Sequence, residues 1–180
     1  METGNRSMYR KSRRWMAGLL EKITLKQQRQ FYLLAALIGL TSGVSAVAFH
    51  RSINWAENNF IQTVNELSGI WLYVFLLGAP TLGGLVVGFL IRYWAPEAAG
   101  SGMPQTKAAY FIKFGRIRFR TAVSKYILGT VSIGSGASLG REGPTVQISA
   151  ALASWVGRWL GLAPKLVMRL IPLGAAGGIA

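Results

Sequence analysis

The residues best suited to chemistry lie in one glycine-rich stretch, residues 134–147, which holds a single acid, Glu142. Glycine lets a ligand approach the main chain, and Pro144 suits the first turn of a helix. The stretch therefore predicts a tight loop that opens a helix at about Gly143. Such an opening presents free N–H groups and the positive end of the helix dipole, which attract anions. Ionised Glu142, at the mouth of this opening, would compete with an anion for the same place.

A second opening of the same kind lies upstream, in the sequence Ala-Gly-Ser-Gly-Met-Pro at residues 99–104. Glycines, a small hydroxyl residue and a proline again precede a helix-like run, here to about Phe114. Ser101 falls near the N-cap of that helix. Its hydroxyl either caps a backbone N–H, as serine normally does there, or donates to a bound anion.

The same residues match no complete enzyme or nucleotide-binding motif. Residues 136–140 fit the G-x-S-x-G nucleophile pattern, but no histidine or aspartate follows Ser138. Gly140 is followed by Arg141, which breaks a P-loop, and Leu139 occupies the third glycine position of a dinucleotide fingerprint. The chain has no cysteine and one histidine, so we expect no enzyme, no metal site and no cofactor.

Composition indicates a membrane protein, because 51% of the 180 residues are hydrophobic and only 14% are charged. The net charge of +14 does not indicate a nucleic-acid partner. Eight of the twenty Lys and Arg residues precede residue 30, and six more lie in residues 92–120. These clusters flank uncharged spans, as the positive-inside rule expects of cytoplasmic segments.

The N-terminal half of the chain predicts two membrane spans. Residues 1–29 form a basic cytoplasmic tail or an amphipathic surface helix, and residues 30–50 carry no charge and can cross a bilayer. A signal peptide is the competing interpretation, disfavoured by the length of the apolar run. Residues 51–69 are poor in positive charge and predict an outside loop, and residues 67–91 form a second span that Pro80 should kink. Two glycine pairs in these spans are spaced for close helix packing, Gly39 with Gly43 and Gly84 with Gly88.

Shorter apolar helices follow. Residues 121–133 enclose Lys125, which either faces a cavity or extends to the membrane surface. A helix over residues 145–156 is too short to span upright. A break at Pro164 precedes a helix over residues 170–180, in which Gly174 and Gly178 are spaced for packing. The run stops without a polar tail, which predicts a truncated chain. Together these elements predict an all-α membrane protein whose short, broken helices point their N-termini at one anion site.

The two motifs identify a family resemblance. Gly-Ser-Gly-Met-Pro at residues 100–104 resembles the GSGIP motif of the CLC chloride channels and proton/chloride antiporters, and residues 140–144 match that family's GREGP motif. The resemblance runs from about residue 30 to the end. It implies tilted and broken transmembrane helices, with residues 30–180 forming most of the first of two inverted repeats. Residues 1–29 then form the basic cytoplasmic tail.

The resemblance also assigns roles to single residues. It implies that Ser101 coordinates the central chloride, and that Glu142 is the external gate and carries the proton. Lys125 matches the family's lysine that shapes the field of the pore. With Ser101, the anion-binding set of the two helix openings contains Gly100, Gly102, Arg141 and Gly143.

The function implied is chloride transport, with proton-coupled antiport favoured over a passive voltage-gated channel. A non-transporting membrane scaffold or subunit is the alternative from a different class. The family further implies a homodimer of the full-length protein in the lipid bilayer, which is the inner membrane if the source is bacterial. The second half of the family's fold, with its further anion-binding helix, lies outside residues 1–180.

Overall fold

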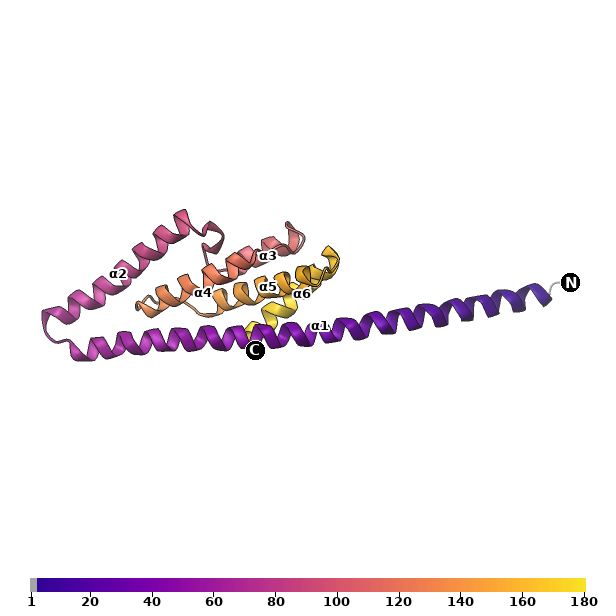
Figure 1. Ribbon diagram of the computed structural model, residues 1–180, viewed down its shortest axis with the longest axis horizontal. Coiled ribbons are helices and arrows are strands. Elements are labelled where there is room, and N and C mark those ends of the chain that lie inside the picture. The colour runs from indigo at the N-terminus through magenta and orange to yellow at the C-terminus, as the bar shows by residue number, and fades with distance from the viewer. Residues whose placement is uncertain (1–2) are drawn as a thin grey trace. The chain divides into compact units, whose positions relative to one another are not determined.

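The structure is a computed structural model that describes the backbone of residues 3–180 and the side chains of residues 31–180. The chain divides into two compact units, residues 1–37 and 38–180, and the N-terminal unit holds the first turns of α1. Helices account for the regular structure in the described residues, as the sequence predicts. They are α1 (Thr3–Glu66), α2 (Ile70–Tyr93), the 3-10 turn η1 (Pro96–Ala98), α3 (Met103–Phe111), α4 (Phe119–Gly134), α5 (Glu142–Trp159) and α6 (Pro164–Ile179) (Figure 1).

The predicted outside loop at residues 51–69 is wrong over most of its length, because α1 continues to Glu66. The prediction rested on the sparse positive charge of residues 51–69, and charge carries no information on backbone conformation. Because no glycine or proline interrupts residues 51–66, nothing in this segment stops the helix. Pro80 lies inside an uninterrupted α2. Pro164 begins α6 at its first turn, six residues before the predicted start, since proline is pre-organised for that position.

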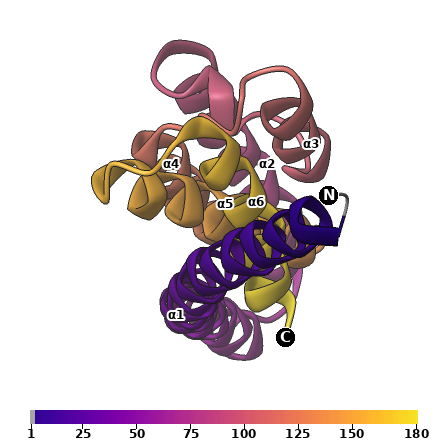
Figure 2. The ribbon, with the colours of Figure 1, turned by 90° about the vertical axis from the view of Figure 1, so that its right-hand side faces the viewer.

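Within residues 38–180, α5 is the central helix, lying between α4 and α6 and also packing on α3 (Figures 1 and 2). Its buried face consists mainly of small residues, so its neighbours approach closely. A Cβ added to Gly174 of α6 would lie 2.7 Å from the Ser149 carbonyl oxygen, and one added to Gly178 would lie 2.3 Å from the Ser149 hydroxyl. The predicted packing role of these two glycines is therefore confirmed.

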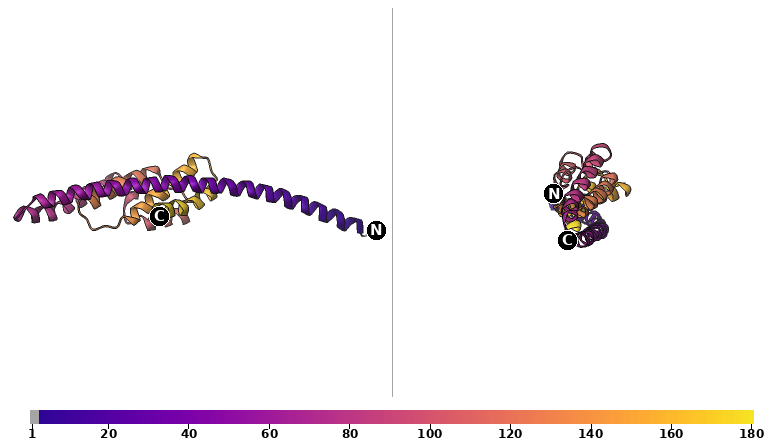
Figure 3. Two further views of the ribbon diagram at one scale, coloured as in Figure 1. Left: turned by 90° about the horizontal axis from the view of Figure 1, so that it is seen from below. Right: turned by 90° about the vertical axis from the view of Figure 1, so that its left-hand side faces the viewer.

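Residues 38–66 of α1 cross the same group of helices, as seen from below in Figure 3. The rings of Phe49 and Tyr126 lie 5.4 Å apart between α1 and α4, and a Cβ added to Gly134 would lie 2.4 Å from the Cβ of Ala56. Phe49 and Ile53 belong to the main buried cluster with residues of α4, α5 and α6. This part of α1 therefore completes the core.

Helix α2 has an apolar sequence and yet no buried residue. The glycine pairs predicted to pack closely, Gly39 with Gly43 and Gly84 with Gly88, have no described atom within 4 Å of an added Cβ. Segments Phe31–Glu66 and Ile70–Tyr93 each contain an 18-residue stretch of high mean hydropathy, 1.9 and 2.2, and they are long and apolar enough to cross a membrane. Exposed apolar surface of this kind is the surface a bilayer covers.

Candidate anion site

The first motif forms a loop that opens α3. Gly100 and Gly102 have φ angles of 76° and 100°, which favour glycine because a Cβ would be strained there. The N-cap is Gly102 and not Ser101, so of the two alternatives for the Ser101 hydroxyl the capping role is wrong. Gln105 replaces it: its Oε1 accepts a 3.0 Å hydrogen bond from the Gly102 N–H, and its Nε2 donates to the Ala99 carbonyl at 2.7 Å. The Ser101 hydroxyl is left for other partners.

Lys125 holds the same loop from α4. Its side chain is buried, and its Nζ donates to the carbonyl oxygens of Ala98, at 2.8 Å, and of Gly100. The lysine therefore faces inward and does not extend to a surface. Gln147 of α5 supports the loop from another side, with its Nε2 donating to the Glu97 carbonyl at 3.2 Å. Long polar side chains thus satisfy the carbonyls of the residues that lead into α3.

The second motif opens α5 beside the first. Glu142 is the first residue of α5, and its N-cap, Arg141, makes no side-chain capping hydrogen bond. A Cβ added to Gly143 would lie 2.2 Å from the Ser101 carbonyl oxygen, and one added to Gly102 would lie 2.6 Å from the Gly143 carbonyl oxygen. The N-terminal turns of α3 and α5 therefore touch main chain to main chain, and only glycine permits this contact.

A cavity of about 400 Å³ opens at this contact. Five of the seven sequence-predicted site residues line it: Gly100, Ser101, Lys125, Glu142 and Gly143. Apolar side chains of α2 and α4 close another part of the wall, among them Val87 and Leu128. The site thus combines two helix N-termini whose N-cap residues make no side-chain capping hydrogen bond, a hydroxyl, a buried ammonium and one carboxylate. Helix N-termini and cations attract anions, and an ionised carboxylate at such a place would compete with one.

The structure does not place the other two residues in the cavity wall. Gly102 is buried and does not line the cavity. The Arg141 guanidinium turns to α1, where it pairs with the Glu57 carboxylate at 2.8 Å and donates to the Asn54 side-chain oxygen at 3.0 Å. Arg141 is thus placed to fix the loop before Glu142 to α1, and its side chain contributes no donor to the cavity.

The supporting residues were not predicted from the sequence. Gln105 carried a local signal, since glutamine three residues after an N-cap forms a capping box. Gln147 and Glu57 carried no local signal, because their hydrogen-bond partners lie 50 and 84 residues away in the sequence. Only the tertiary structure brings these residues together.

Sequence and structure comparisons place this geometry among known proteins. Residues 83–180 match the family described as voltage gated chloride channel. The chain is 35% identical over 153 residues to the H(+)/Cl(-) exchange transporter ClcA of Klebsiella pneumoniae strain 342, covering 82% of this chain and 32% of that protein. It is 37% identical over 129 residues to the same transporter of Salmonella arizonae, covering 69% and 27%.

A solved structure agrees with these relatives. The crystal structure of a slow cyanobacterial Cl−/H+ antiporter superposes with a TM-score of 0.71 at 28% identity, covering 82% of this chain and 35% of that one. The chain therefore spans about a third of the length of the proteins it matches. Family match, sequence identity and fold agree, and the chain belongs to the voltage gated chloride channel (CLC) family of integral membrane proteins.

Proposed function

We propose that this chain forms the first half of the ion pathway of a proton-coupled chloride antiporter and is not an enzyme. The observation that carries the proposal is the contact between Ser101 and Gly143, which brings the N-termini of α3 and α5 to one cavity lined by Glu142. Chloride is the proposed anion, since the matched relatives are named for chloride and proton exchange. The protein would act in the inner membrane of a bacterial source, as a homodimer, with residues 1–29 as a cytoplasmic tail.

In this proposal each residue has a distinct task. Main-chain N–H groups of α3 and α5 hold chloride, with the Ser101 hydroxyl as an added donor. Ionised Glu142 occupies the anion's place, and protonation releases it, which links one proton to anion entry. Lys125 keeps the carbonyls of Ala98 and Gly100 directed away from the anion.

Reconstitution into liposomes of this chain together with the second half that completes the ion pathway tests the proposal, with chloride release followed by an electrode and proton movement by external pH. Glu142→Gln should keep chloride flux and abolish proton flux driven by a chloride gradient, because the amide cannot carry the proton. Glu66→Gln, at the far end of α1, is the matched control and should retain both fluxes. Coupled proton flux in Glu142→Gln would refute the role of this carboxylate.

The two alternatives give different results in the same assay. A passive channel would release chloride without moving protons in the unsubstituted protein. A scaffold or subunit would give no chloride flux at any protein density, and that result would overturn the transport proposal for this chain.

A further inference from the structure

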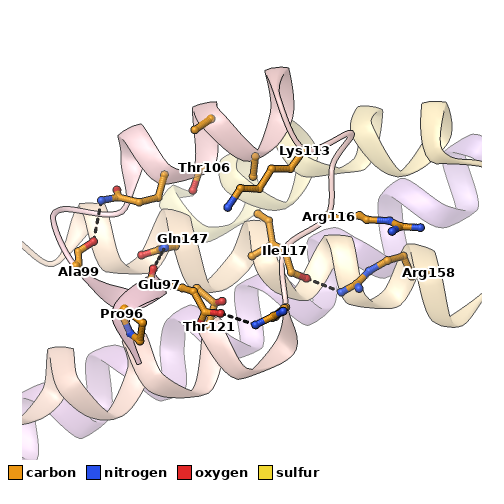
Figure 4. Close-up of a pocket in the computed structure, with 14 residues that line it drawn as sticks. Pro96, Glu97, Ala99, Thr106, Lys113, Arg116, Ile117, Thr121, Gln147 and Arg158 are labelled. Carbon is orange, nitrogen blue, oxygen red and sulfur yellow. Dashed lines mark hydrogen bonds and ion pairs between the residues drawn. The ribbon is translucent and has the colours of Figure 1, made fainter. Parts of the chain in front are cut away.

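A second, larger cavity of about 780 Å³ is lined by η1, α3, the loop after α3, the first turn of α4 and two residues of α5, Gln147 and Arg158 (Figure 4). Its lining is strongly basic. It contains four cationic side chains and a single acid, Glu97. The cations are Lys113, Arg116, Arg118 and Arg158.

Pairing neutralises only one of these cations. Arg118 forms a 2.8 Å ion pair with Glu97. Arg158 donates to the carbonyl oxygens of Ile117 and Ser154, which fixes its guanidinium but leaves its charge uncompensated. Lys113 and Arg116 form no ion pair within residues 31–180, and the cavity therefore carries three uncompensated positive charges. In Figure 4, Arg116 and Arg158 lie at one end of the cavity and Ala99 at the other.

Exposed aromatic side chains alternate with these cations along the chain. Phe111 and Phe114 flank Lys113, with 76% and 69% of their surface exposed, and Trp155 and Trp159 flank Arg158. The two indole rings stack with their centroids 6.3 Å apart, and the ring of Phe119 lies 5.1 Å from that of Trp155. Aromatic and basic side chains together are typical of the boundary between hydrocarbon and water.

We propose that this basic cavity binds the phosphate headgroup of an anionic phospholipid. Lys113, Arg116 and Arg158 would surround the phosphate, which guanidinium groups bind in a bidentate manner. The exposed Phe and Trp side chains would contact the glycerol and upper acyl region. A free phosphate ion would use the cations alone and leave these aromatic surfaces without a partner, so the combination favours a lipid. The site adjoins the anion loop, since Glu97, Ala99 and Gln105 border both.

Native mass spectrometry of the purified protein tests the proposal, with phosphatidylglycerol or phosphatidylcholine added to the detergent. We expect one retained phosphatidylglycerol per chain in preference to phosphatidylcholine. Arg116→Gln and Lys113→Gln should each weaken phosphatidylglycerol binding by about fivefold, the usual effect of one basic residue near an anionic leaflet. Arg92→Gln, an exposed cation at the end of α2 that does not line the cavity, is the matched control and should leave retention unchanged.

Two further results decide between a lipid and its headgroup alone. Water-soluble glycerol phosphate should not displace the lipid at equal concentration. Trp159→Ala should reduce retention of phosphatidylglycerol while leaving the Tm of the protein unchanged. Equal retention of the two lipids, equal loss in Arg92→Gln, or displacement by glycerol phosphate would each overturn the proposal. So would full retention in Arg116→Gln and Lys113→Gln, the result expected if another protein segment covers the cavity. None of these readouts depends on ion flux, so the antiport proposal stands or fails separately.

Discussion

Replacing Gly143 by alanine has two opposing effects on stability: higher helix propensity stabilises the protein, and a steric clash destabilises it. Gly143 lies in the first turn of α5, where helix propensity alone favours alanine by up to about 1 kcal/mol. The added Cβ, however, would lie 2.2 Å from the Ser101 carbonyl oxygen, whereas ordinary contact begins at 3.4 Å. The two main chains must therefore separate by about 1.2 Å, and no side-chain rotation can relieve the clash.

The magnitude follows from these numbers. Overpacking a tight contact costs about 1–3 kcal/mol, and a clash with backbone belongs at the upper end. After the gain in propensity, we expect a net destabilisation of about 2 kcal/mol. For a chain of this size that corresponds to a Tm lower by about 4–8 °C. Chloride affinity should fall as well, because the two sets of N–H groups no longer converge.

Tryptophan fluorescence during heating in detergent measures the Tm, and isothermal titration measures chloride binding. Gly140→Ala is the matched control, since it lies in the same motif and has no described atom within 4 Å of an added Cβ. It should leave both quantities close to those of the unsubstituted protein. A Gly143→Ala protein as stable as Gly140→Ala, with equal chloride affinity, would refute the contact between the two helix openings.

Two further predictions concern the residues that hold the site. Lys125→Met removes the donor from two carbonyls, and we expect destabilisation of about 2–4 kcal/mol and weaker chloride binding, measured by the same two methods. An unchanged Tm would contradict the anchoring role. Arg141→Gln breaks a pair whose side chains are 39% and 32% exposed, so solvent screening limits the loss to about 1 kcal/mol or less. A double-mutant cycle with Glu57→Gln should give a coupling of that size at low salt that disappears at 1 M salt, and a coupling independent of salt would argue against an ion pair.

The anion site was predictable from the sequence where glycine spacing dictates the backbone. The helix openings near residues 102 and 142 follow from glycine and proline positions alone, and the structure brings both to one cavity. The role of Ser101 as a cap failed, because the positive φ of Gly102 moves the N-cap one residue onward. A serine next to a glycine does not reveal which of the two ends the loop.

Long-range partners account for the remaining differences. Arg141 was predicted to bind the anion as part of the second helix opening, but the carboxylate that pairs with it belongs to α1. That carboxylate was itself assigned to a loop, because the sparse positive charge of residues 51–69 was read as a connection between spans. Lys125 left two alternatives open, and only the fold shows the two carbonyls that its ammonium contacts.

Because α3 and α5 contact each other through their main chains, the site should be sensitive to any substitution of the glycines at this contact. Every missense change at a glycine codon adds a Cβ atom, whatever the chemical nature of the new residue. At Gly102 and Gly143 that atom would fall within 2.6 Å of a backbone oxygen. A mutational scan should therefore find these two codons intolerant of all substitutions alike, while Gly140, the first residue of the second motif, accepts small residues. The pattern of intolerance would then mark where the two main chains touch and would depend little on the chemical nature of the substituted side chain.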